Sequence, residues 1–348
     1  MAMSAERSSL IDPQQRVIDY LRVSITDRCN YACRYCIPGD GVEHVDRQDV
    51  LSFEEIVALV RVFVALGVRR VRLTGGEPTV RRDLVRLVRM LREIPGLEEI
   101  ALSTNGHLLT ELASPLRAAG VDRLNVSLDS LDPERFRRIT RRGDLARVIA
   151  GIDAARAAGF TSIKLNVVAL RGGNDDEFDR ICAWAWARGL LPRFIEEMPM
   201  ADGRTYRPES QVAAAEIRER IAAAWPGTRA VADDARGAPG AGPARYFRIE
   251  PEAPGADATS SPRRFGIISP MTEHFCTTCN RLRLSTAGAL HACLGHDDAV
   301  DLRGPLHAGG PDAVARGIRA ALAGKRPGHK FQLIGLGGPR KAMVQIGG

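Results

Sequence analysis

The sequence predicts an α/β fold: an open, partial barrel of the TIM type with about six strand–helix units, followed by a C-terminal extension. Two observations support this prediction. Short strand-like runs alternate with helical runs over residues 20–197, which is typical of a parallel sheet covered by helices. The alternation stops after six units, whereas a closed barrel needs eight. A chain of 348 residues has room for one large domain with an appendage.

The six units can be placed from their apolar patterns and their caps. The predicted strands cover residues 20–26, 71–74, 100–104, 123–128, 162–170 and 193–197. The predicted helices cover residues 53–66, 83–93, 108–119, 133–139, 145–158 and 175–188. Ser52 is the expected N-cap of the first helix, and Gly67 follows its end. Ligands bind at the carboxyl ends of such strands, so functional residues should cluster there.

The rest of the chain supports a division into an arm, a barrel, a linker and a C-terminal module, at residues 1–19, 20–231, 232–264 and 265–348. The barrel ends in a helix near 211–224. The linker is rich in Ala, Gly, Pro and Asp, which favours a long surface loop, and it contains a strand-like stretch at 246–249. The C-terminal module contains a helix near 312–322 and a glycine-rich tail.

The composition excludes several classes of protein. Hydrophobic residues make up 45% and charged residues 26%, as in ordinary globular proteins. Apolar runs fall far short of the roughly 18 residues of a membrane-spanning helix. The first ten residues lack the apolar region of a signal peptide, so we expect a cytoplasmic protein with no membrane partner.

The net charge of +7 comes almost entirely from arginine. Only four residues are lysines, namely Lys164, Lys325, Lys330 and Lys341. Guanidinium groups bind phosphates and carboxylates in a bidentate manner, which fits a phosphorylated small substrate. The densest basic cluster, residues 135–142, is interpreted as a solvated helix face and loop. Because there is no contiguous basic tract, we expect no nucleic-acid partner.

Three cysteines directly follow the first predicted strand: Cys29, Cys33 and Cys36. Three thiolates on a short loop can bind three irons of a [4Fe–4S] cluster and leave the fourth iron open for a ligand. A structural zinc site normally has four ligands, and the nearest histidine, His44, lies eight residues beyond Cys36. Structural zinc and incidental cysteines remain the alternatives at this loop.

A second group of three cysteines lies near the other end of the chain, at Cys276, Cys279 and Cys293. Three histidines lie close to it: His274, His291 and His296. On spacing alone a Cys3His zinc site competes with a second iron–sulfur cluster. The seventh cysteine, Cys182, belongs to neither group and is expected to be a buried thiol within a helix.

Two motifs resemble those of the radical S-adenosylmethionine (SAM) superfamily. The first is the Cys29-x3-Cys33-x2-Cys36 loop with Tyr35 before its third cysteine, and the second is the Gly-Gly-Glu-Pro stretch at 75–78. The resemblance implies that the open iron chelates SAM. An electron from the cluster then cleaves SAM to methionine and a 5′-deoxyadenosyl radical.

The C-terminal module resembles one family within that superfamily. Residues 271–275, the Cys-Asn-Arg-Leu-Arg-Leu-Ser stretch at 279–285 and the final two glycines are similar to the molybdenum cofactor biosynthesis protein A family, the GTP 3′,8-cyclases. The similarity runs from residue 21 to residue 348 and is weakest over 232–264. It implies a second [4Fe–4S] cluster on the second cysteine group.

The resemblance also implies the reaction. Such a lyase converts GTP to 3′,8-cyclo-7,8-dihydro-GTP, the first step of molybdenum cofactor (molybdopterin) biosynthesis. The 5′-deoxyadenosyl radical removes the hydrogen from C3′ of GTP, and the resulting radical attacks C8 of guanine. No catalytic residue is implied beyond the two clusters and bound SAM.

Matching positions give the expected ligand contacts. For SAM they are Tyr35, Gly76, Ser127 and Met198, and for GTP they are Arg22, Arg72, Ser103, Lys164, Arg281 and Arg283. Arg193 is expected near the substrate, and the flexible Gly347-Gly348 tail is expected to enter the site. Each of these residues also has a purely structural interpretation. The arginines and Lys164 could be charges on a strand face, and Ser103 could cap a helix or occupy a turn. Met198 could be a core residue, and the final glycines could be a frayed terminus.

The resemblance implies partners as well. They are a downstream cyclic pyranopterin monophosphate synthase and an electron donor such as flavodoxin or ferredoxin. A homodimer is a further possible assembly. A peptide-modifying radical SAM enzyme with an auxiliary cluster is the alternative enzyme. From other classes, a two-cluster electron carrier predicts no SAM turnover. A zinc-stabilised nucleic-acid binder predicts zinc and salt-sensitive binding.

Overall fold

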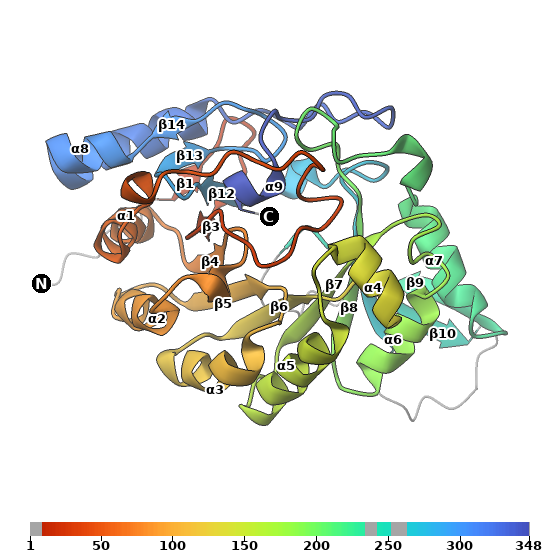
Figure 1. Ribbon diagram of the computed structural model, residues 1–348. Helices are drawn as coiled ribbons and strands as arrows, with labels where there is room; N and C mark the ends of the chain where they lie inside the picture. Colours follow the sequence, from red (N-terminus) through yellow and green to blue (C-terminus); the bar gives the residue numbers. More distant parts are fainter. Residues whose placement is uncertain (1–8, 234–241, 252–262, 348) are drawn as a thin grey trace, which may run out of the picture.

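The computed structural model describes residues 9–233, 242–251 and 263–347 (Figure 1). Within them, six parallel strands form the centre of one large sheet, in sequence order. These strands are β3 (Tyr20–Ser24), β4 (Arg70–Thr74), β5 (Glu99–Thr104), β6 (Arg123–Ser127), β7 (Ile163–Ala169) and β8 (Leu191–Glu196). In this part of the chain the two outermost strands of the sheet do not pair with each other, so the prediction of an open, partial barrel is confirmed.

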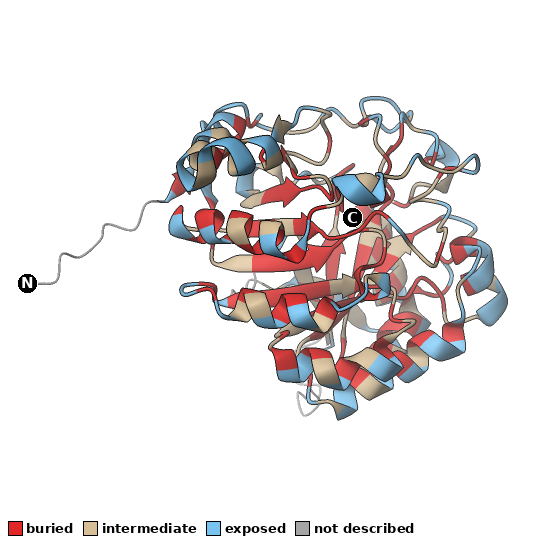
Figure 2. Ribbon diagram, turned by 60° about the vertical axis from the view of Figure 1, so that its left-hand side comes forward, coloured by how far each residue is buried: buried red, intermediate tan, exposed pale blue. Residues whose placement is uncertain are grey.

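Helices cover the outer face of this sheet, with their buried sides toward it (Figure 2). They are α1 (Phe53–Ala65), α2 (Leu84–Arg92), α3 (Leu109–Ala119), α4 (Pro133–Thr140), α5 (Leu145–Ala157) and α6 (Phe178–Trp186). The start of α1 follows from its sequence, because Ser52 and Glu55 form a reciprocal capping box. Ile56 and Phe63 of this helix are fully buried. The interior is thus apolar on the helix side, which leaves the opposite face of the sheet for polar residues.

The C-terminal part of the chain extends the same sheet at both edges. β12 (Arg281–Leu284) lies parallel to β3, and β11 (Arg264–Ile268) lies parallel to β8. The outer strands are antiparallel to their neighbours: β13 (Ala289–His291), β14 (Val300–Asp301), β10 (Arg245–Pro251) and β9 (Thr228–Ala232). The strand-like stretch predicted at 246–249 is confirmed, and it lies within β10. The remainder of the predicted linker falls largely outside the described residues.

The remaining helices lie in the second half of the chain. They are α7 (Ala214–Ala223), α8 (Arg303–Ala323) and α9 (Met343–Ile346). α8 begins earlier than predicted because two helices join across a kink at Gly310, just before Pro311. Short 3-10 turns occupy Arg47–Asp49, Pro78–Val80, Pro208–Ser210 and Cys276–Thr278.

The predicted arm contains a small hairpin within its described part. β1 (Leu10–Ile11) pairs antiparallel with β2 (Val17–Ile18), and Leu10 and Ile18 are buried. These residues therefore pack against the rest of the protein. None of the helices in the described part of the chain has the length and apolarity needed to cross a bilayer.

Candidate active site

A cavity of about 260 Å³ lies at the inner face of the sheet, where polar side chains of all six parallel strands meet residues of the second cysteine group. The predicted site residues that line it are Arg22, Tyr35, Arg72, Ser103, Ser127, Lys164, Arg193, Met198, Cys276, Cys279, Arg281, Arg283 and Cys293. Alternation along each strand places these side chains on the inner face. The cavity therefore gathers residues that are far apart in the sequence.

Three arginines lie at one level across three adjacent strands. Arg22 on β3 is directly opposite Arg72 on β4 and Arg283 on β12. Burial lowers the pKa of Arg22 well below its usual value, and the charges of Arg283 and Arg72 add to this effect. Three guanidinium groups this close repel one another, so an anion between them would relieve the repulsion.

Lys164 and Arg193 extend this cationic surface across β7 and β8. Lys164 Nζ lies 3.3 Å from the Tyr246 hydroxyl oxygen, and Arg193 Nη2 donates to Asn166 Oδ1 at 2.6 Å. The cavity cations that form no ion pair with a carboxylate in the described part of the chain are Arg72, Lys164, Arg193, Arg281 and Arg283. Arg123, by contrast, lines the same cavity but pairs with Glu99 at 2.9 Å. The free charge is thus concentrated on the predicted ligands.

The first cysteine loop follows β3 and packs against α4. Thr140 and Ile139, at the end of that helix, accept hydrogen bonds from the Ala32 and Arg34 amides at 3.1 and 3.0 Å. Burial raises the pKa of the Cys29 thiol to about 11, and it also raises the pKa of Cys33 and Cys36. Thiols buried in this way ionise only when a cation joins them, which fits a loop completed by iron.

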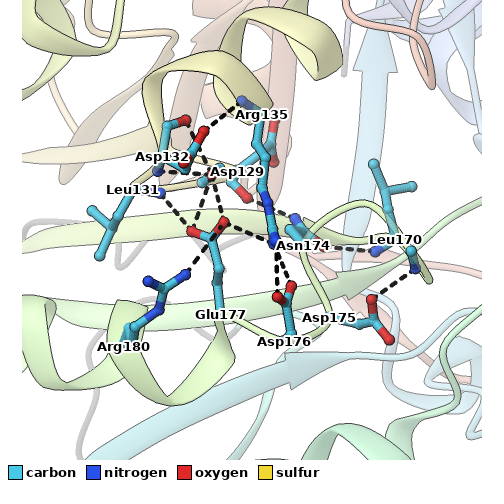
Figure 3. Close-up of polar contacts among 12 residues, drawn as sticks. Asp129, Leu131, Asp132, Arg135, Leu170, Asn174, Asp175, Asp176, Glu177 and Arg180 are labelled. Atoms are coloured by element: carbon cyan, nitrogen blue, oxygen red, sulfur yellow. Dashed lines mark hydrogen bonds and ion pairs between the residues drawn. The ribbon is translucent and has the colours of Figure 1, made fainter.

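Tyr35 connects this loop to the ends of β6 and β7. Its hydroxyl donates to Asp129 Oδ2 at 2.7 Å, and Asp129 Oδ1 accepts from the Val168 amide at 2.9 Å. Figure 3 shows Asn174 beside Asp129, where its amide donates to the backbone oxygens of Asp129 and Val168 at 2.6 and 2.8 Å. The Tyr35 side chain is therefore held in place by a buried carboxylate.

A second buried carboxylate fixes the loops around it (Figure 3). Glu177 accepts from the Ser130 hydroxyl and the Leu131 amide, both at 2.9 Å, and pairs with Arg135 at 3.2 Å. Arg135 also forms an ion pair with Asp176. These contacts hold α4 against the start of α6, and α4 in turn supports the first cysteine loop.

The Gly-Gly-Glu-Pro turn packs directly against the chain that leads into the first cysteine loop. The Gly76 amide donates to the Thr26 oxygen at 2.7 Å. A Cβ on Gly76 would lie only 2.3 Å from the Arg28 oxygen, so only glycine fits. Gly76 does not line the cavity described above; it lies against the backbone of residues 26–28.

Glu77 belongs to the Gly-Gly-Glu-Pro motif, but the sequence did not reveal what its side chain contacts. Its buried carboxylate accepts from the Thr104 hydroxyl at 2.7 Å and the Asn105 amide at 2.6 Å. It thereby ties the turn after β4 to the turn after β5. The position of this glutamate, directly after two glycines at a strand end, could have marked it in the sequence. Its hydrogen-bond partners could not be predicted, because they lie 27 and 28 residues further along the chain.

Replacing Gly76 with alanine should destabilise the protein by about 1–3 kcal/mol, because the new methyl group collides with backbone. Urea unfolding measures the loss, and iron content after reconstitution should fall with it. Gly39→Ala is the matched control, since nothing lies within 4 Å of a Cβ there. Equal stability of the two variants would contradict the packing argument.

Comparison with known proteins decides the family. Residues 23–185 match the Radical SAM superfamily, and residues 192–331 match Molybdenum Cofactor Synthesis C. A GTP 3′,8-cyclase of Pseudomonas fluorescens (strain Pf0-1) is 47% identical, over 93% of this chain and 94% of its own. Another, of Rhodopseudomonas palustris (strain TIE-1), is 46% identical over 92% and 90%. This chain belongs to the GTP 3′,8-cyclase family.

The resemblance to the GTP 3′,8-cyclases, first seen in the motifs, is thereby confirmed over most of the chain. The peptide-modifying alternative and the two non-enzymatic alternatives lose their support, because the relatives carry one name across both matched regions. Among solved structures, Streptococcus suis SuiB bound to S-adenosylmethionine is similar over 60% of this chain and 47% of its own, with 15% identity and a TM-score of 0.48.

The second cysteine loop of this cyclase fits the second [4Fe–4S] cluster of its family. Burial alone would raise the pKa of Cys279, but Arg281 and Lys325 outweigh it and lower the pKa to about 7. A thiol that ionises near neutral pH is ready to bind iron. Among residues 9–233, 242–251 and 263–347, no three His, Cys, Asp or Glu side chains are placed around one metal ion. Cluster ligands bind separate irons and need not meet at one point.

Two buried cations of this cyclase support the second loop and were missed in the sequence. Lys325 Nζ lies 3.9 Å from Cys279 Sγ and donates to the Arg281 oxygen at 3.1 Å. Arg16, in the predicted polar arm, donates to the Cys276 oxygen at 2.6 Å. Neither residue belongs to a motif, and both act on backbone or sulfur that is distant in the sequence.

The C-terminal tail of the cyclase reaches the same region. Arg283 donates to the Gly347 oxygen, and Gly347 lies against Thr74 and Ser24 at the ends of β4 and β3. Val344 of α9 packs in a small apolar cluster with Cys36 of the first loop. Gly348 falls outside the described residues. Cys182 is fully buried, as predicted.

Proposed function

We propose that this chain is a GTP 3′,8-cyclase that binds GTP in the cavity between its two cysteine loops. The product is 3′,8-cyclo-7,8-dihydro-GTP, the first intermediate of molybdenum cofactor biosynthesis. One observation carries the proposal: cations from four strands, β4, β7, β8 and β12, form no ion pair with a carboxylate in the described chain and converge on a cavity that the second cysteine loop also lines. A triphosphate is the substrate group that such a surface suits.

When bound, the clusters and SAM supply the radical chemistry, and the residues of this chain bind and orient the reactants. We assign Arg22, Arg72 and Arg283 to the phosphates, because their guanidinium groups share one level of the sheet. Ser103 lies beside Arg72 Nη1 at 3.4 Å and can add a hydroxyl. Arg281 lies 3.7 Å from Cys279 Sγ, which places it where substrate and second loop meet.

The SAM side of the site is assigned to the first loop and its supports. Tyr35, Ser127 and Met198 line the cavity, whereas Gly76 positions the first loop from behind. The hydrogen bond from Tyr35 to Asp129 holds the Tyr35 ring, so this residue orients SAM through the ring or the backbone.

GTP affinity should fall as the pH rises above 7. Burial lowers the pKa of Lys164 to about 7, with help from Arg193 and Arg72. A bound triphosphate favours the charged amine, so above that pKa binding must take up a proton. Affinity should then drop by at most about tenfold per pH unit. Calorimetric titration of GTP between pH 6 and 8.5 measures the slope.

Lys164→Arg is the matched variant for this experiment, because guanidinium keeps its charge over the whole range. Its affinity should change little with pH. Parallel slopes in the wild-type protein and the variant would show that Lys164 is not the titrating group.

The reaction itself is tested anaerobically. The protein is reconstituted with iron and sulfide, reduced with dithionite and given SAM, and 5′-deoxyadenosine is measured with and without GTP. GTP-dependent formation, with deuterium transferred from C3′-labelled GTP, is the expected result. SAM cleavage that ignores GTP would point to another substrate, and a zinc-containing protein without SAM cleavage would overturn the proposal.

The finer parts of the proposal concern partners and organisation. We propose residues 20–231 as the unit for SAM and residues 265–348 as the unit for the second cluster. The product would pass to a cyclic pyranopterin monophosphate synthase in the cytoplasm. An external protein such as flavodoxin or ferredoxin would supply electrons, and gel filtration with light scattering would show whether the chain forms a homodimer.

A further inference from the structure

Five exposed arginines surround the first cysteine loop, and no step proposed above uses them. This arginine patch consists of Arg34, Arg137, Arg138, Arg141 and Arg142. In the described part of the chain none of the five forms an ion pair with a carboxylate. None lines the substrate cavity either. The patch is therefore free positive charge on the outside of the protein.

The patch is bound to the cysteine loop by direct contacts. Arg34 lies between two of the cysteines, and its amide donates to the Ile139 oxygen of α4 at 3.0 Å. Arg141 Nη1 donates to the Ile37 oxygen, just after the third cysteine, at 3.1 Å. The patch arginines thus lie on the cysteine loop, on α4 and on the turn that follows α4, and Figure 1 shows the position of this helix.

The absence of carboxylate partners is not common to all arginines of α4. Arg135, on the same helix, pairs with Asp176 and Glu177 (Figure 3). The arginines of α6 and α7 have carboxylate partners too: exposed Arg180 pairs with Glu177, and half-buried Arg220 pairs with Asp175 and Glu216. Exposed arginines without a carboxylate partner occur elsewhere in the described chain, as at Arg61 and Arg89, but at the end of α4 four of them lie within residues 137–142. Like charges held together without partners cost stability, which favours an external anionic partner.

We propose that the arginine patch is the docking surface for an acidic electron-transfer protein, which delivers electrons to the first cluster. This inference rests on the proposed function, because a cluster that cleaves SAM must be reduced again from outside. In each transfer the donor loses one electron and the cluster gains one, and no bond forms or breaks. The donor must approach the loop that holds the cluster, and the patch borders that loop.

The chemistry of the patch fits a redox protein better than a nucleic acid. Redox encounters are small and transient, and opposite charges accelerate them. Binding of single-stranded nucleic acid would also need exposed aromatic side chains for stacking. Tyr31 of this loop and Phe136 of α4 are buried, and Tyr35 of the loop lines the substrate cavity.

The test reverses two charges that make no contact with the loop. Arg137→Glu with Arg138→Glu is compared with the wild-type protein and with a control, Arg61→Glu with Arg89→Glu, which reverses two exposed arginines of α1 and α2. An acidic flavodoxin serves as the probe. Its affinity for the reconstituted protein is measured by biolayer interferometry at several salt concentrations, and cluster bleaching by reduced flavodoxin is followed by anaerobic stopped flow.

The patch variant should bind flavodoxin at least tenfold more weakly and depend less on salt, whereas the control should stay within twofold. SAM cleavage driven by dithionite should be unchanged in both, since a small reductant needs no docking. Unchanged flavodoxin affinity, or an equal loss in the control, would overturn the proposal. If the charge-reversal variant differs from the wild type in iron content or thermal unfolding, the Arg137→Gln with Arg138→Gln variant replaces it. This variant should lose less flavodoxin affinity than the charge reversal.

Failure of the proposed function would look different. It would appear as an absence of GTP-dependent SAM cleavage with dithionite in the wild-type protein, whatever flavodoxin does. Selective loss of binding to a control RNA, with flavodoxin binding intact, would mark the patch as a nucleic-acid site and would also overturn the docking proposal.

Discussion

Replacing Cys36 with alanine should abolish SAM cleavage, lowering its rate by at least about a thousandfold. Three thiolates are the fewest that can hold a [4Fe–4S] cluster with one open iron, so the loss of one removes the cluster. Cys36 is also the cysteine that packs against the C-terminal tail, through Val344. Iron should drop from about eight to about four atoms per chain, because the second cysteine group is untouched.

The matched control for this variant is Cys182→Ala, which also removes a cysteine side chain from the protein. Cys182 is fully buried in α6 and belongs to neither loop. It should keep its iron and its activity, at a cost of about 1 kcal/mol in unfolding free energy for the small cavity. Iron analysis and 5′-deoxyadenosine formation are the measurements. A Cys36 variant that kept full iron and activity would refute the ligand assignment.

Replacing Arg22 or Arg283 with alanine should weaken GTP binding by about 10- to 100-fold. A hydrogen bond to a charged group contributes about 1.5–3 kcal/mol, and a bidentate contact lies toward the upper end. The two arginines face each other across β3 and β12, so each also controls the spacing of the other. The uncoupled background cleavage of SAM, measured without GTP, should be the same in both variants as in the wild type, because these residues act on the substrate.

Conservative variants separate charge from geometry at these positions. Arg22→Lys keeps the charge but loses the bidentate fork, so it should recover only part of the affinity. Arg61→Ala, an exposed arginine on α1, is the control and should bind GTP as the wild type does. Calorimetric titration gives the affinities. If GTP binding and GTP-independent SAM cleavage fell together, the variant would have a folding defect and the assignment would fail.

Local elements were predictable because their signals are local. The capping box at Ser52 marks the start of α1, and the strand of β10 was visible within a segment otherwise rich in Gly and Pro. The kink at Gly310 shows the limit of such reasoning, since the pattern alone indicated only the second half of α8. The hairpin of residues 10–18 was missed because its two short strands carry too few apolar residues to show a period.

The sequence by itself determined the order of the six strand–helix units, the two cysteine groups and the residues that end each of these six strands. These follow from periodicity and spacing within a few residues. Only the tertiary structure decided which strand ends meet. The pairing of β12 with β3 places Arg283 opposite Arg22, 261 positions earlier, and the fold brings Arg16 to the Cys276 loop. Glu77 likewise finds Thr104 only because β4 and β5 are neighbours. Such contacts depend on sheet order and register, which no local pattern specifies.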